Sequence, residues 1–182
     1  SMCRQLALRL SELTGAALYG CFVNYKKQHL TASDGSALSC FSRFIEEMRA
    51  EKLRQLFDAK PVLLRLVASV TRQWIDATAE FVERLNRDIG QICERFIGDD
   101  AERLVVHVGG GIADLHNGGR SVLIVRFSNG TDILYKPKSL RVDSLWCDTV
   151  DLLNSLDPPI DMKAASVISC EDYGWGEFIH HA

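Results

Sequence analysis

The residues with the clearest chemical potential lie in one glycine-rich segment. Five glycines occupy the eleven positions from residue 109 to residue 119, which read GGGIADLHNGG. Because glycine has no Cβ atom, the backbone N–H groups of such a segment can approach an anion closely. Lys136 follows at the end of the apolar run ILY, directly before Pro137. An anion-binding backbone and a nearby ammonium group together predict a site for phosphate groups.

Four polar side chains stand within or directly after the same segment: Asp114, His116, Asn117 and Arg120. His116 could exchange a proton near neutral pH, and Arg120 could bind a phosphate as a two-pronged fork. Asp114 could orient His116 or bind a metal ion. The alternative is a loop in which Asp114 and Asn117 satisfy the backbone of the loop itself. A loop that only covers phosphates does not need so many polar side chains.

Short β-type runs flank the loop at residues 104–108 and 122–127, and a third run covers residues 133–135. The sequence Ser-Asn-Gly-Thr at residues 128–131 predicts a two-residue hairpin turn between antiparallel strands. A phosphate loop of the G-x-x-x-x-G-K-[ST] type and a dinucleotide-binding fingerprint both need a helix after the glycines, whereas here a strand follows. The arrangement that remains is a loop folded over phosphates between two antiparallel strands, as in protein kinases.

A helix is predicted after the third run, over residues 143–156, with Asp143 as a possible N-cap residue. In kinases the lysine of the third strand pairs with an acid on the following helix. By position, Asp148 and Asp151 are candidate partners for Lys136, and the sequence does not choose between them.

Two further β-type runs, at residues 165–170 and 175–180, complete the order β-β-β-α-β-β. This is the order of the smaller lobe of a protein or lipid kinase. We therefore predict an α+β fold in which residues 1–100 form a helical region. Residues 101–182 are expected to form a kinase-like small lobe, with an antiparallel five-stranded sheet and one helix.

The first hundred residues have helical periodicity. Apolar residues recur at steps of three and four over residues 6–17 and again over residues 41–48. A third helical pattern begins at Pro61 and continues to about residue 96, with a break expected near Val70-Thr71, where β-branched residues meet. The arginine and glutamate pairs of these helices are typical of a solvated surface.

The bulk composition narrows the possible classes of function. The net charge of −3 gives no support to a nucleic-acid partner. The longest apolar runs are far shorter than the ~20 residues that cross a bilayer, so we expect no membrane-spanning segment. The six cysteines are irregularly spaced, without zinc-binding patterns. Free thiols in the reducing cytoplasm are therefore expected.

Three sequence blocks, DLHNGGRSV, FSNGTDILYKPKSL and YGWGEFI, resemble the dehydratase region of class II lanthipeptide synthetases, the LanM family. The helical stretch from AKPVLLRL through WIDATAEFVERLNRD also looks like the segment that precedes these blocks in that family. The resemblance covers most of the chain from about Phe44 onward.

The resemblance implies a lipid-kinase-like fold that uses ATP and Mg²⁺ to phosphorylate Ser and Thr of a precursor peptide rich in Ser, Thr and Cys. The phosphate is then eliminated to give dehydroamino acids, and a separate zinc-containing cyclase domain adds the Cys thiols. Lys136 would contact the nucleotide phosphates. Asp114 and His116 would be catalytic, with their division between phosphorylation and elimination left open. The other cofactor-binding residues would be Asn117, Gly118, Gly119 and Arg120.

A complete kinase also needs a second lobe with a catalytic aspartate and two metal ligands, and this sequence ends at Ala182. It has no Cys/His set for the cyclase zinc either. We therefore expect the chain to act with the remainder of a longer polypeptide and not to phosphorylate a peptide by itself. One alternative is a non-catalytic peptide- or domain-binding module with a structural glycine-rich loop. Another is a different ATP-using transferase with the same small lobe.

Overall fold

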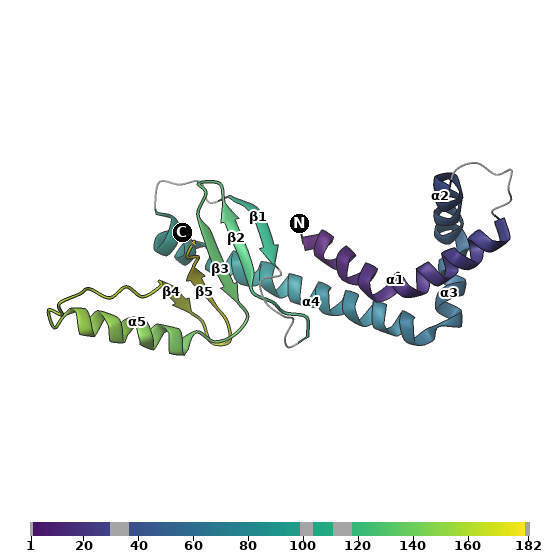
Figure 1. Ribbon diagram of the computed structural model, residues 1–182. Helices are drawn as coiled ribbons and strands as arrows, with labels where there is room; N and C mark the ends of the chain where they lie inside the picture. Colours follow the sequence, from purple (N-terminus) through teal and green to yellow (C-terminus); the bar gives the residue numbers. More distant parts are fainter. Residues whose placement is uncertain (1, 30–36, 99–103, 111–117, 181–182) are drawn as a thin grey trace. The chain divides into compact units, whose positions relative to one another are not determined.

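The computed structural model describes residues 2–29, 37–98, 104–110 and 118–180 (Figure 1). Its helices, together with a five-stranded antiparallel sheet, confirm the predicted α+β fold. The chain forms two compact units, one of residues Cys3–Arg72 and one of Gln73–Ala182 with Ser1–Met2.

The first unit is helical. It contains α1 (Met2–His29), α2 (Ala37–Glu47), a π-helical turn (Met48–Lys52), α3 (Leu53–Ala59) and the first turns of α4 (Pro61–Ile92). As the apolar spacing of α2 predicts, Phe44 and Met48 are buried, and they pack in one cluster with Tyr25 of α1. The hydroxyl of Tyr25 donates a hydrogen bond of 2.7 Å to Glu47, which ties α1 to the end of α2.

Helix α1 is long and apolar enough to cross a membrane when judged by length and composition alone. Core helices of soluble proteins and signal sequences pass the same test, so the finding is weak evidence. The absence of a membrane-spanning segment therefore stays a prediction.

Helix α4 starts at Pro61, as predicted. Proline suits the first position of a helix, because a backbone N–H at that position would have no acceptor within the helix. The helix continues through Val70-Thr71 without interruption, so the expected break is wrong. β-Branched residues lower helix stability by only roughly 0.5 kcal/mol each, which good helix formers nearby can offset. A π-helical turn at Cys93–Ile97 follows, and Gly98, with φ of 88°, ends the helical path.

The second unit is built around the sheet, whose strands have the order β1-β2-β3-β5-β4 with every neighbouring pair antiparallel. The strands are β1 (Val105–Gly110), β2 (Leu123–Phe127), β3 (Asp132–Lys136), β4 (Val167–Ser169) and β5 (Gly174–Glu177).

The connection between β2 and β3 differs from the predicted two-residue turn. Phe127 and Thr131 pair across a three-residue loop, because the Phe127 N–H donates to the Thr131 carbonyl at 2.9 Å. Only Gly130 has a positive φ, 87°, among the loop residues, and the side chain of Asn129 accepts the Thr131 N–H at 3.0 Å. Asn-Gly thus marks the hairpin correctly, but as a longer loop type whose last residue is a left-handed glycine.

One face of the sheet packs against α4 (Figure 1). Phe81 and Ile92 of the helix are buried in one cluster with Val125, Ile133 and Trp175 of three strands. Each such side chain stabilises the fold by roughly 1.5–3 kcal/mol. The compact units divide at residues 72 and 73, because the second half of α4 is part of the sheet's core. The predicted domain boundary at residue 100 stays a prediction.

Helix α5 (Arg141–Asn154) follows β3 and begins two residues before the predicted start. Its N-cap residue is Leu140, which has no polar side chain and makes no side-chain cap hydrogen bond. Leu140 is fully buried, so packing and not capping fixes the start of this helix. The proposed N-cap role of Asp143 is wrong, since Asp143 lies within the first turn.

Candidate functional site

The strand register places Lys136 at the same end of the sheet as both ends of the glycine-rich loop. Gly110, the last residue of β1, pairs with Leu123, the first residue of β2. Leu123 in turn pairs with Tyr135 of β3, the residue before Lys136. Neighbouring strands lie about 4.8 Å apart. The loop that joins β1 to β2 therefore begins two strands away from Lys136 and ends on the strand next to it.

Side chains alternate between the two faces of a strand, which separates Lys136 from the core. Tyr135 is buried in the cluster that α4 covers, so Lys136 lies on the opposite face. The residue opposite Lys136 on β5 is Gly174, which carries no side chain. The paired position of β5 therefore places no side chain beside Lys136 on the face away from α4.

The Nζ atom of Lys136 lies 3.4 Å from Oδ1 of Asp143, in the first turn of α5. A carboxylate in a first helical turn is also favoured by the helix dipole. Among the described residues the acid beside Lys136 is thus Asp143, and neither Asp148 nor Asp151. From the sequence, Asp143 was expected to cap the helix, whereas the structure places it inside the first turn of α5, seven residues after Lys136.

Two of the predicted cofactor-binding glycines are described, and both need to be glycine. Gly118 and Gly119 have φ values of 80° and 88°, which side chains strongly disfavour. A Cβ atom on Gly119 would also lie 3.0 Å from the Cβ atom of Gln73 on α4. The backbone of Gly119 therefore lies directly against the helix, a use of glycine that the sequence pattern did not predict. Phosphate binding by this pair stays a prediction.

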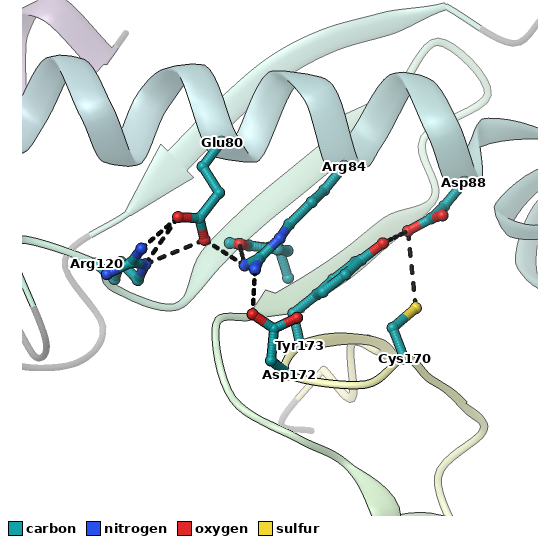
Figure 2. A network of polar contacts seen from close by, with 8 residues as sticks. Glu80, Arg84, Asp88, Arg120, Cys170, Asp172 and Tyr173 are labelled. Atoms are coloured by element: carbon teal, nitrogen blue, oxygen red, sulfur yellow. Dashed lines mark hydrogen bonds and ion pairs between the residues drawn. The ribbon is translucent and has the colours of Figure 1, made fainter.

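Arg120 makes a two-pronged ion pair with Glu80 of α4 (Figure 2). The Nε atom of Arg120 lies 3.1 Å from each carboxylate oxygen. The Arg120 guanidinium holds the pKa of the Glu80 carboxyl below its ordinary value, against the opposing effect of burial. Arg120 was expected to bind a phosphate in the same two-pronged manner. In the structure it fastens the end of the glycine-rich loop to α4.

Arg84, one turn beyond Glu80, extends this network to β3 and to the turn before β5 (Figure 2). Its guanidinium pairs with Glu80, donates to the Tyr135 hydroxyl at 2.7 Å and to Asp172 at 2.6 Å, and lies 4.1 Å from the centre of the Tyr173 ring. The arginine and glutamate pairs of α4 were expected to be solvated, but only 11% of the Arg84 side chain is exposed. This pair therefore joins α4 to β3 and to the turn before β5.

Asp88 is the deepest polar residue of the same helix face and is only 6% exposed. Its Oδ2 atom accepts hydrogen bonds from the Tyr173 hydroxyl at 2.7 Å and from the indole N–H of Trp175 at 2.8 Å. The Cys170 thiol lies 3.8 Å away (Figure 2). Burial, followed by the hydrogen bond to Asp88, raises the pKa of the Tyr173 phenol strongly. The spacing of Glu80, Arg84 and Asp88, four residues apart, was the signal available in the sequence.

The opposite end of the sheet has a second polar cluster that sequence reasoning did not identify. Arg126 makes two hydrogen bonds of 2.8 and 2.7 Å to the buried carboxylate of Asp132 and thereby lowers the pKa of that carboxyl. Asp132 lines a cavity of about 350 Å³, together with His180. Gly130 of the hairpin borders the same cavity, which lies at the far ends of β2 and β3 from Lys136.

Three of the predicted site residues, Asp114, His116 and Asn117, lie outside the described residues. Their proposed roles in catalysis and cofactor binding stay predictions. The described part of the site is therefore Lys136 with Asp143, and the end of the loop from Gly118 to Arg120.

The Glu80 pair predicts a pH dependence of stability. Because the folded-state pKa of Glu80 is depressed, the pair stabilises the fold above the unfolded pKa of about 4.3 and this contribution is lost as the pH falls through the folded value. Glu80→Gln should lower the free energy of unfolding at neutral pH by about 1–2 kcal/mol. Urea unfolding from about pH 6 to about pH 3 should show a shallower loss in the variant than in the wild type. Parallel pH curves for the two proteins would contradict this assignment.

Comparison with known proteins places the chain in a protein family. No curated protein matches the chain at a significant level. Residues 61–182, from the start of α4 to the end of the chain, match the family model described as domain of unknown function DUF4135. This stretch contains all the residues of the candidate site and more than half of the sequence. The chain therefore belongs to the DUF4135 domain family.

Proposed function

We propose that this chain is the small-lobe part of a class II lanthipeptide synthetase dehydratase. In that function it helps to phosphorylate Ser and Thr of a precursor peptide with ATP and Mg²⁺ and to eliminate the phosphate. Two lines support the proposal: the DUF4135 domain is associated with lanthipeptide synthetases, and the sequence blocks around Lys136 resemble the dehydratase region of that family.

The observation that carries the proposal is the Lys136–Asp143 pair. Kinases hold their nucleotide-contacting lysine on the third strand through an acid on the following helix. Here the lysine ends β3, the acid lies in the first turn of α5, and a glycine-rich loop joins β1 to β2 at the same end of the sheet. If the loop were purely structural and Lys136 an unrelated surface lysine, there would be no reason for the loop, Lys136 and Asp143 to lie at the same end of the sheet.

Among the described residues, Lys136 and the end of the glycine-rich loop have groups that could bind the phosphates of a nucleoside triphosphate. Lys136 offers an ammonium group whose side chain is 25% exposed. Gly118 has no Cβ atom, so its backbone N–H group could come close to an anion. When bound, ATP would supply the phosphoryl group that turns a peptide hydroxyl into a leaving group. The chain would contribute charge and position: Asp143 orients Lys136, and Arg120 fixes the end of the loop to α4. Asp114 and His116 are proposed to move protons in the same loop.

Nucleotide titration tests the proposal. We expect the protein to bind Mg·ATP in isothermal titration calorimetry, and Lys136→Ala to weaken this binding by about tenfold or more, equivalent to about 1.4 kcal/mol. Lys138→Ala is the matched control, because Lys138 is two positions away, exposed and outside the Asp143 contact. Equal affinities for the wild type and Lys136→Ala would rule out the proposed role of Lys136.

A non-catalytic binding module is the second candidate, favoured by one observation. Gly119 and Arg120 both contact α4, which gives the end of the loop a structural use independent of any ligand. This candidate predicts no heat of Mg·ATP binding in the same titration, even at millimolar nucleotide, and binding of a Ser/Thr/Cys-rich peptide that does not depend on nucleotide.

A further inference from the structure

The side chain of Arg84 connects the two strands that meet at Lys136. Its guanidinium donates at 2.7 Å to the hydroxyl of Tyr135, the residue before Lys136 on β3. It also donates at 2.6 Å to Asp172, in the turn before β5. Lys136 pairs in the sheet with Gly174, the first residue of β5. One side chain of α4 is thus bonded to β3 one residue before Lys136, and to the chain two residues before Gly174.

Glu80 extends this contact to the end of the glycine-rich loop (Figure 2). Its carboxylate pairs with Arg84, one turn along α4, and each of its two oxygens lies 3.1 Å from the Nε atom of Arg120. Arg120 lies three residues before β2, where the loop returns to the sheet. A continuous path of charged contacts therefore joins the loop end to both strands beside Lys136.

Glu80 and Arg84 lie on the opposite side of the sheet from any ligand of Lys136. Tyr135, which Arg84 contacts, is buried in the cluster that α4 covers. Successive side chains of a strand point to opposite faces, so Lys136 lies on the face away from α4. A phosphate beside Lys136 would be separated from both residues by the sheet. Any influence of the two residues on that phosphate must therefore act through the positions of the strands and the loop end.

The network is built to hold these positions. Only 11% of the Arg84 side chain and 23% of the Glu80 side chain are exposed, so salt screens their charges less than it would at the surface. The planar guanidinium also fixes the directions of its hydrogen bonds, which the flexible ammonium group of a lysine does not. The Cζ atom of Arg84 lies 4.1 Å from the centre of the Tyr173 ring, which restricts the side chain further. Arg84 therefore cross-links the elements around it.

We propose that Glu80 and Arg84 are positioning residues for the phosphates of the nucleotide. From the far face of the sheet they hold the loop end at a fixed distance from Lys136, so that the loop backbone and the ammonium group act on one phosphate chain. This role rests on the proposed function, and it adds to the site two residues that touch no ligand. A misplacement of about 1 Å can cost about a hundredfold in enzymatic rate, so breaking the network should measurably weaken nucleotide binding.

Titration with Mg·ATP by calorimetry measures this loss. Arg84→Met keeps most of the apolar stem and removes the guanidinium, and we expect it to weaken binding by about tenfold. Arg126→Met is its control, because Arg126 also pairs with a buried carboxylate, that of Asp132, but at the far ends of β2 and β3. This control should leave the affinity for Mg·ATP unchanged. Circular dichroism should show both variants folded.

Glu80→Gln tests the link to the loop with almost no change of shape. It removes the charge that holds Arg120, and we expect it to weaken Mg·ATP binding by about threefold or more. Glu83→Gln is the matched control, because it makes the same replacement on the same helix at an exposed position outside the network. This second control should bind Mg·ATP as the wild type does.

Amide hydrogen exchange without nucleotide measures how firmly the loop end is held. Arg84→Met and Glu80→Gln should each speed exchange at Arg120 more than at Val125, in the centre of β2. In Arg126→Met the ratio of these two exchange rates should stay that of the wild type. A general loosening of the fold raises both rates together, so the ratio separates positioning of the loop from stability alone.

The outcomes distinguish this role from the proposed function. If the wild type binds Mg·ATP and both Arg84→Met and Glu80→Gln bind it equally well, the positioning role is overturned while the proposed function stands. If exchange at Arg120 and Val125 rises by the same factor, the role is overturned as well, because the network then supports stability alone. If the wild type binds no Mg·ATP at millimolar nucleotide, the proposed function is overturned and the role toward phosphates with it.

Discussion

Replacing Asp88 with alanine is expected to destabilise the unit of residues 73–182 by about 3–5 kcal/mol. The carboxylate of Asp88 accepts hydrogen bonds from Tyr173 and Trp175, and both donors are buried. Without this acceptor the phenol and indole groups would stay desolvated and unpaired. Each unsatisfied buried group costs about 1–3 kcal/mol, and the alanine also leaves a space.

The matched variant is Asp88→Asn, which keeps one oxygen able to accept a hydrogen bond. We expect it to cost about 1–2 kcal/mol, since one charge-assisted bond is weakened and the other is lost or exchanged. Urea unfolding followed by tryptophan fluorescence measures both variants, because Trp175 is fully buried beside the carboxylate. Equal losses for the alanine and asparagine variants would mean that volume, and not hydrogen bonding, explains the importance of Asp88.

Replacing Gly174 with alanine should be nearly as damaging, by about 3 kcal/mol. A Cβ atom at this position would lie 2.6 Å from both the Ile168 carbonyl oxygen and the Cδ1 atom of Leu140. Neither can move aside easily, because the first is backbone of the neighbouring strand and the second is a fully buried side chain. The extra methyl group must therefore push β5 away from β4 or displace the start of α5.

Gly176 is the control, on the same strand and on the same face. A Cβ atom there would be 3.9 Å from its nearest neighbours, an ordinary contact distance. Gly176→Ala should therefore change the free energy of unfolding by less than about 0.5 kcal/mol. Because Gly174 pairs with Lys136 in the sheet, Gly174→Ala should also weaken Mg·ATP binding, whereas Gly176→Ala should not. Similar stability losses in the two variants would contradict the assigned contacts.

The sequence was sufficient for the features that depend on local patterns. Short β-type apolar runs bounded by turn residues predict the strands, and the placement of Lys136 after ILY puts it at the end of β3 beside the loop. These predictions need only the residue types typical of strands and turns and the chemistry of glycine. The Asn-Gly turn was located for the same reason, although its loop is one residue longer than predicted.

The features that the sequence did not reveal depend on contacts between distant segments. Glu80 and Arg84 have the spacing of a solvated helical pair, and nothing local shows that Tyr135, about fifty residues later, lies above them. The partner of Lys136 was missed for a related reason. The start of α5 is set by the burial of Leu140, which is a tertiary contact, so no capping signal marked Asp143 as a first-turn residue.

The strand order also has a consequence for the order of events during folding. In the sequence β1-β2-β3-β5-β4, the edge of β3 stays open until β5 is added, although β5 is the last strand of the sheet to be synthesised. An open edge can pair with other chains. Strand β5 also carries Trp175, whose indole N–H donates to Asp88. The pairing of β5 with β3 and the formation of this hydrogen bond to the buried carboxylate therefore occur together. On the ribosome, the second unit would therefore stay incomplete until residue 177 has emerged from the exit tunnel, which makes the nascent chain a natural substrate for chaperones.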